Sequence, residues 1–156
     1  MIFEKIQLWH APELSRLTKA SKASWGYTKK EMQSWNAALT ITREHLITHV
    51  GYRLLSARML VGYYTYCTTD TGIKLENFFI DPRCINQGYG KEMLTHFLQR
   101  ISESSASKIY LEADPHAESF YHKFGFKTVG SVPSSIPGRS LPIMELKIGE
   151  IPRKLT

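Results

Sequence analysis

Apolar residues near the start of the chain recur at helical spacing. Pro12, which is favoured in the first turn of a helix, opens such a pattern, which continues with Leu14, Leu17 and Ala20. Thr28 and Glu31 have the three-residue spacing of a capping box, so we expect a second helix to run to about Leu39. A third, short helix is predicted from residue 42 to about residue 50.

The hydrophobic period then changes from helical to extended. Residues 52–56 and 59–66 are rich in aromatic and aliphatic side chains, and the short link between them predicts a hairpin. A turn over residues 68–72 leads into a strand at 73–80, which completes an antiparallel meander. An earlier strand is indicated by apolar residues among polar ones, namely Phe3, Ile6 and Leu8.

The second half of the chain reads as helix, strand, helix and two strands. A helix over residues 88–102 is followed by a strand at 109–113, so strand 73–80 and strand 109–113 should form a right-handed parallel crossover. We expect a short helix at 116–124, ended by Gly125, a strand at 126–132, a loop at 131–142 and a last strand at 141–148. The pattern predicts an α/β (α+β) fold with a mixed, mostly antiparallel sheet and flanking helices.

Composition adds limits on class and compartment. With 156 residues, 42% of them hydrophobic, the chain should form one domain over residues 1–156. No apolar run approaches the roughly 20 residues that span a bilayer, and no signal-peptide core is visible. Cys67 and Cys84 make neither a disulfide framework nor a metal site. We therefore expect a cytoplasmic protein with no metal and no membrane partner.

The net charge of +6 suits a polyanionic ligand, whether nucleic acid, an anionic membrane or a small molecule. Lysine and arginine are scattered and form no run of five or six like charges, which argues against a nucleic-acid partner. A nucleic-acid-binding domain rests on net charge alone and is the weakest of the functional hypotheses.

A glycine-containing turn follows the strand at 73–80, which Asp81-Pro82 ends. The turn Asn86-Gln87-Gly88-Tyr89-Gly90-Lys91 opens the helix at 88–102, and unpaired N–H groups at a helix N-terminus bind anions, most often phosphate. A Walker loop fails because Glu92 follows Lys91, and the dinucleotide fingerprint fails because Met93 stands at its third glycine.

Two motifs resemble those of the GCN5-related N-acetyltransferases, the GNAT family. Gly88 and Gly90 match the acyl-CoA loop Arg/Gln-x-x-Gly-x-Gly/Ala, although Ile85 stands at its leading position. Some thirty residues later the chain resembles the signature Asn-x-x-Ala-x-x-Phe/Leu-Tyr-x-x-x-Gly-Phe, with matches at Ala117, Phe120, Tyr121, Gly125 and Phe126. Asp114 replaces the asparagine and adds a negative charge. The order of elements from residue 2 to residue 148 also resembles that fold.

The resemblance implies a splayed parallel strand pair that receives acetyl-CoA. The pantetheine would pair with the backbone of Phe78, Phe79 and Ile80, and the pyrophosphate would lie on the N–H groups of Gln87 to Lys91. Asn86 is a further implied cofactor contact. Asp114 and Phe120 would complete the cofactor contacts. The acceptor would be a small-molecule or peptide amine. The chain most resembles small bacterial members of the family, and that likeness names no substrate. A homodimer stays open.

The resemblance also implies catalytic roles. Tyr121 lies where the family places the general acid that protonates the departing thiolate, and Glu76 is the candidate base that takes the amine proton. Glu112 is the alternative base. His116 and His122 are interpreted as surface residues, and Cys84 is not expected to carry the acyl group.

Recognition of the acceptor amine is less clearly encoded. Trp25 and Tyr27 would wall a pocket for a cationic amine, or anchor two helices in the core. Arg139 would face an acceptor carboxylate or the solvent. The main competing hypothesis is a non-catalytic acyl-CoA sensor or interaction module on the same fold.

Overall fold

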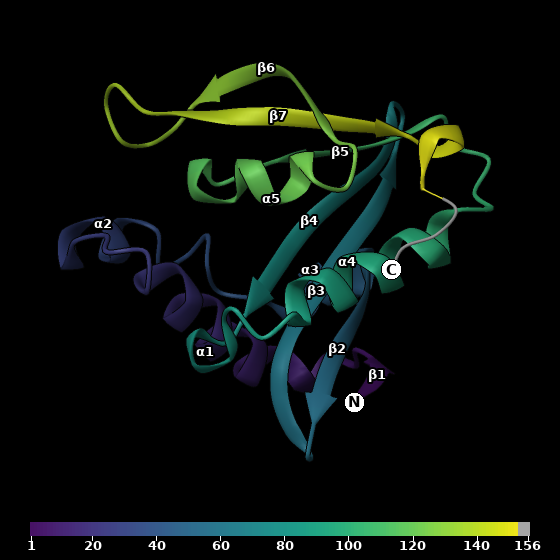
Figure 1. Cartoon of the computed structure of the whole chain (residues 1–156). Helices are drawn as coiled ribbons and strands as arrows, with labels where there is room; N and C mark the ends of the chain where they lie inside the picture. Colours follow the sequence, from purple (N-terminus) through teal and green to yellow (C-terminus); the bar gives the residue numbers. More distant parts are fainter. Residues whose placement is uncertain (153–156) are drawn as a thin grey trace. The chain divides into compact units, whose positions relative to one another are not determined.

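The computed structural model describes residues 1–152 (Figure 1). They form two compact units: the first contains Met1–Cys67 and Asn77–Leu94, and the second contains Thr68–Glu76 and the chain from Thr95 onwards. Each unit combines segments that are distant in the sequence, so neither is a contiguous domain. A single domain over residues 1–156 stays a prediction, and its last four residues lie outside the described part.

The described residues contain seven strands in the order β1-β2-β3-β4-β5-β7-β6. Strand β4 pairs with β5 in parallel, through Ile73 with Ile109 and Lys74 with Tyr110, whereas β1–β2, β2–β3, β5–β7 and β6–β7 are antiparallel. The predicted mixed, mostly antiparallel sheet and its parallel crossover are confirmed. The strands are β1 Ile2–Lys5, β2 Val50–Ser56, β3 Met59–Thr69, β4 Gly72–Ile80, β5 Lys108–Glu112, β6 Lys127–Pro133 and β7 Ser140–Lys147.

The predicted helices are present with changed lengths: α1 Ala11–Ala23, α2 Lys29–Ser34, α3 Arg43–Thr48, α4 Tyr89–Ile101 and α5 Glu118–His122. The capping box of α2 is confirmed, because Thr28 Oγ1 accepts the Glu31 N–H at 3.1 Å and Glu31 Oε1 accepts the Thr28 N–H at 2.8 Å. The prediction that α2 reaches Leu39 is wrong. Trp35 leaves the helical conformation at φ −97° and ψ 1°, and its ring packs edge-on against Tyr27. No described helix has the length and apolar character needed to cross a membrane.

Three other predicted boundaries moved. The first strand ends at Lys5, and Leu8 begins a 3-10 turn. The helix expected over residues 116–124 is a 3-10 turn, Pro115–Ala117, followed by α5. The loop expected over 131–142 is confined to residues 134–139, because β6 and β7 pair as far as Pro133 with Ser140. Strand β6 lies at the edge of the sheet, where a proline costs no ladder bond.

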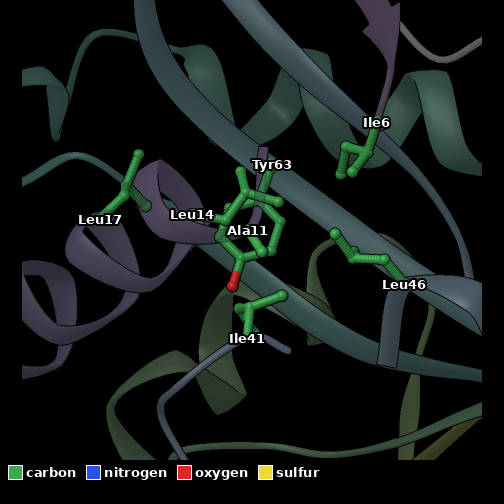
Figure 2. Close-up of a cluster of buried hydrophobic side chains, with 7 residues drawn as sticks. All are labelled: Ile6, Ala11, Leu14, Leu17, Ile41, Leu46 and Tyr63. Carbon is green, nitrogen blue, oxygen red and sulfur yellow. The ribbon is translucent and has the colours of Figure 1, made fainter. Parts of the chain in front are cut away.

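The hydrophobic core of the first unit lies between α1 and the strands (Figure 2). Its buried members are Ile6, Ala11, Leu14, Leu17, Ile41, Leu46 and Tyr63. The Tyr63 hydroxyl pairs with Thr18 within this core, and the Tyr63 ring stacks on Phe79 with centroids 6.0 Å apart. Because Phe79 belongs to β4, this packing fixes the end of β4 that precedes the glycine turn.

Gly62 allows a close approach at the same place. A Cβ atom on Gly62 would lie 2.7 Å from the Phe79 carbonyl oxygen and 2.7 Å from Met93 Sδ. Any side chain at position 62 would therefore displace β4 or the start of α4. The second unit has buried residues of its own on α4, β5, α5 and β7, among them Phe97, Ile109, Leu111, Tyr121, Phe126, Met144 and Leu146.

We predict that Leu14→Ala lowers the free energy of unfolding by about 3 kcal/mol, because it leaves a cavity in the cluster of Figure 2. Ile47→Ala is the matched control, since Ile47 is 69% exposed and the change there should stay within about 0.5 kcal/mol. Urea unfolding followed by circular dichroism measures both. Equal losses in the two variants would contradict this account of the core.

Candidate active site

In the first unit, the glycine turn begins where β4 ends. The Asp81 N–H donates to the Val61 carbonyl at 2.7 Å, which is the last bond that ties this end of β4 to β3. The Asp81 carboxylate then accepts the Arg83 N–H at 2.8 Å and pairs with the Arg83 guanidinium, also at 2.8 Å. The chain is thus turned through Pro82–Cys84, a 3-10 turn, before it reaches the glycines.

The turn itself depends on left-handed backbone conformations. Asn86 has φ +64° and Gly88 has φ +85°, and α4 begins directly afterwards at Tyr89. A Cβ atom on Gly88 would meet nothing within 4 Å, so open space adjoins the helix N-terminus. The first N–H groups of α4 have no partner inside the helix by its geometry. The turn therefore leaves open space where the anion site is predicted, and the site itself stays a prediction. Ile85, which departs from the family's loop pattern, is 38% exposed.

The residues expected to pair with pantetheine, Phe78, Phe79 and Ile80, lie at the end of β4 and are half-buried. The Phe79 ring is directed into the core of the first unit, where it contacts Tyr63. The side chain of Phe79 is therefore structural, and only its backbone is available for a cofactor role.

In the second unit, Tyr121 lies on α5 and is 6% exposed. Its ring packs edge-on against Phe120, with centroids 5.2 Å apart, and against Phe126 at 5.6 Å. Burial raises the pKa of Tyr121 well above its ordinary value, which keeps the phenol protonated. Tyr121 is thus both part of the core and a proton-bearing group.

Asp114 lies two residues after the end of β5. Its negative charge is paired with a positive one within the second unit. Its Oδ2 accepts from Arg139 Nη2 at 3.1 Å, and both side chains are largely buried. Its Oδ1 accepts the His116 N–H at 3.0 Å and contacts His116 Nδ1 at 2.8 Å. The negative charge that replaces the family's asparagine is therefore neutralised by Arg139, whose guanidinium is already paired and does not point free into solvent.

Glu76 lies on the exposed face of β4, opposite buried Leu75, because successive side chains of a strand point to opposite faces. Its Oε2 is 3.2 Å from Lys74 Nζ, two residues earlier on the same face. Burial lowers the pKa of Lys74, but the carboxylates of Glu76 and Glu112 raise it more strongly, so that the net shift is upward. The two candidate bases, Glu76 and Glu112, thus both raise the pKa of Lys74.

The histidines and cysteines of this region have structural partners or inert surroundings. His122 donates through Nδ1 to the Phe126 carbonyl at 3.0 Å, and its side chain is 48% exposed. Cys67 and Cys84 are free thiols. Burial and the neighbouring Asp81 raise the pKa of Cys84, which disfavours its thiolate.

The two aromatic residues predicted to wall an acceptor pocket, Trp25 and Tyr27, have different surroundings, and their role stays a prediction. Trp25 is 42% exposed, whereas Tyr27 packs against Trp35, and Lys22 lies over both of these rings. The sequence reasoning missed Trp35 and Lys22 because they meet only through the fold of the α1–α2 connection. It also missed Lys74, which the two-residue alternation around Glu76 would have revealed.

A series of side-chain hydrogen bonds that the sequence did not suggest crosses the first unit. Thr65 Oγ1 donates to Asn77 Oδ1 at 2.6 Å, and the His45 Nε2 atom lies 3.3 Å from the same hydroxyl. Because the Thr65 hydroxyl donates its one hydrogen to Asn77, the His45 ring nitrogen must be the donor in the second contact. These hydrogen bonds connect α3 to β4 through the fully buried Thr65.

The family model of the acetyltransferase (GNAT) domain matches residues 22–141. This is well over half of the chain and takes in both the glycine turn and the Tyr121 motif. The chain therefore belongs to the GNAT family of acetyltransferases.

Among curated proteins, the spermine/spermidine N(1)-acetyltransferase of Bacillus subtilis is 36% identical over 76 residues, which is 46% of this chain. The match spans about half of that relative, 49% of its length.

Solved structures share the fold at low sequence identity. The PaiA N-acetyltransferase from Thermoplasma acidophilum, in complex with coenzyme A, has a TM-score of 0.74 at 18% identity and covers 94% of this chain and 99% of its own. An aminoglycoside 6′-N-acetyltransferase, also complexed with coenzyme A, has a TM-score of 0.71 at 17% identity and covers 99% of both chains. The ribosomal-protein-S18-alanine N-acetyltransferase from Escherichia coli has a TM-score of 0.72 at 16% identity and covers 99% and 98%.

Proposed function

We propose that this protein transfers an acetyl group from acetyl-CoA directly to a primary amine of a small molecule or peptide. The observation that carries the proposal is the turn at Asn86 and Gly88, whose left-handed residues leave open space at the N-terminus of α4. Family membership supports it, as do the relatives named for the acetylation of spermine and spermidine, of aminoglycosides and of a ribosomal protein.

Acetyl-CoA is the proposed co-substrate, and two of the structural neighbours were solved with coenzyme A. The N–H groups of Gln87 to Lys91 would bind its pyrophosphate, and the positive end of the α4 dipole would favour that charge. Asn86 is a further proposed contact. The backbone of residues 78–80 would pair with the pantetheine amides. Asp114 and Phe120 are further proposed contacts, and the reaction needs no metal.

The reaction forms a C–N bond and breaks a C–S bond. A neutral amine attacks the thioester carbon, the sulfur leaves as a thiolate, and the resulting ammonium loses a proton to a base. An amine of pKa about 10 is almost entirely protonated at neutral pH, so a base that delivers the neutral form is useful. Glu76 is proposed for this role, since its exposure lets it pass the proton to solvent.

Tyr121 is proposed as the donor to the leaving sulfur. Its raised pKa keeps the proton on the phenol throughout the pH range in which the enzyme would work. The same shift makes full proton transfer to a thiolate uphill, because a thiol of pKa about 8.5 is the stronger acid. Tyr121 would therefore act chiefly by hydrogen-bonding the developing negative charge as the C–S bond breaks.

The cofactor site predicts that Gly88→Glu loses the rise in melting temperature that acetyl-CoA gives the parent protein. A carboxylate would then occupy the space beside the helix N-terminus where phosphate should bind. Gly26→Glu is the matched control, because Gly26 also has a positive φ, +89°, and equally open surroundings. Calorimetric titration with acetyl-CoA measures both variants, and equal affinity in Gly88→Glu and the parent would contradict the placement.

If Glu76 takes the amine proton, Glu76→Gln should lower kcat/KM by about two to four orders of magnitude. The deficit should shrink as pH rises, because more of the amine is then already neutral. The pH–rate profile of thiol release from acetyl-CoA measures this, with Glu112→Gln assayed beside it. A profile unchanged in Glu76→Gln but altered in Glu112→Gln would transfer the role to Glu112.

For Tyr121, we expect Tyr121→Phe to keep acetyl-CoA affinity and to lower kcat by about tenfold or more. An acyl donor with a more acidic thiol should recover much of that rate. Tyr110→Phe is the control, since it removes a hydroxyl that lies 2.8 Å from Thr69 Oγ1 in the same unit. If Tyr121→Phe loses only about 1 kcal/mol of stability and turns over normally, Tyr121 is a core residue.

The burial of Tyr121 is the observation that favours the alternative, a non-catalytic acyl-CoA-binding module. Such a module would bind acetyl-CoA through the same glycine turn and release no thiol with any amine. A screen of amines with detection of released thiol separates the two functions, because binding without turnover would support only the module.

A further inference from the structure

Two aromatic rings in the first unit lie beside an ammonium group. Lys22 Nζ lies 5.1 Å from the centroid of the Tyr27 ring and 5.3 Å from that of Trp35. The two ring centroids are 4.8 Å apart and the ring planes are nearly perpendicular, at 86°, so the rings pack edge to face and form a corner beside the ammonium. Both distances from the ammonium are within the range of about 6 Å over which a ring face attracts a cation. We call Tyr27 and Trp35 the cation cage.

Local structure holds the cage in place. Gly26, with φ +89°, turns the chain after α1, and the Thr28 capping box then starts α2. Tyr27 precedes that helix and Trp35 follows it, so the length of α2 sets the separation of the walls. Lys22 reaches the cage from the last turn of α1, where the negative end of the helix dipole also favours a cation.

We propose that the cation cage is a binding site for an organic cation and that Lys22 is its resident occupant, displaced when a ligand binds. The rings are half-buried, which leaves a route from solvent. Lysine carries its charge on a flexible stem and can leave the cage without a change in the backbone. A ring face selects an ammonium or quaternary ammonium group over a neutral group of the same shape.

The chemistry of acetyl transfer limits which nitrogen the cage holds. The attacking nitrogen must be neutral, whereas the cage attracts a charged one, so the two are different atoms. If the proposed function holds, the acceptor class is therefore an amine with a second, non-reacting cationic nitrogen. This assignment of the ligand as the acceptor rests on the proposed function, but the existence of the cation site does not.

Direct binding tests the site without acetyl-CoA or turnover. Lys22→Met keeps the length of the side chain and removes the competing charge. Choline should then change tryptophan fluorescence in a saturable way, with a dissociation constant about tenfold or more below that of the parent. The neutral isostere of choline, in which a tert-butyl group replaces the trimethylammonium group, should give no saturable change. Lys22→Gln serves as a second variant if Lys22→Met fails to fold.

Two further variants locate the signal. Trp35→Leu in the Lys22→Met background should abolish the choline response, while Trp9→Phe in the same background should leave it intact, because Trp9 is an exposed residue outside the cage. If neither Lys22 variant binds choline, or if the isostere binds equally well, Lys22 is only a brace between α1 and α2 and the proposal is wrong.

The kinetic arm addresses the acceptor alone. Trp35→Leu should raise KM about tenfold for a diamine acceptor, with kcat unchanged and with little effect on a monoamine. Choline binding in a protein that turns over no amine would support the cage and contradict the proposed function. Turnover of an amine without choline binding in the Lys22 variants would support the proposed function and contradict the cation cage.

Discussion

The close approach at Gly62 is the constraint on which the first unit depends. Because position 62 has no side chain, the Phe79 carbonyl and Met93 Sδ both come to where a Cβ atom would stand. The end of β4 and the start of α4 are thereby held against the same strand, and the chain between them must turn sharply. The left-handed residues Asn86 and Gly88 make that turn. The open space at the start of α4 is thus a consequence of packing on both sides of the turn.

Several features of this structure were predictable because their causes are local. The capping box of Thr28 and Glu31 depends on residues three positions apart, and the exposure of Glu76 follows from strand alternation. The end of α2 at Trp35 was not predictable, because it accompanies packing against Tyr27 across the helix. The pairing of Arg139 with the Asp114 carboxylate joins residues 25 positions apart and had no local signal.

The same distinction holds for the candidate site. The glycine turn and the Tyr121 motif are short and were visible as patterns, and the family match covers both. Most of the groups that surround the candidate site residues belong to other elements and could not be predicted from the sequence. Lys74 beside Glu76 lay within reach of alternation, but the Lys22 contact with Trp35 required the geometry of the α1–α2 connection.

In the second unit, the two side chains that are proposed to donate and accept protons lie in opposite environments. Tyr121 is enclosed by aromatic rings, and burial keeps its proton in place. Glu76 lies on an exposed strand face, where its Oε2 is 3.2 Å from Lys74 Nζ. Acid and base chemistry at one pH requires such a contrast, since groups in one shared environment would compete for the same proton. A buried donor and a solvated acceptor would let the proton of the amine leave to solvent while the hydrogen bond to the sulfur persists.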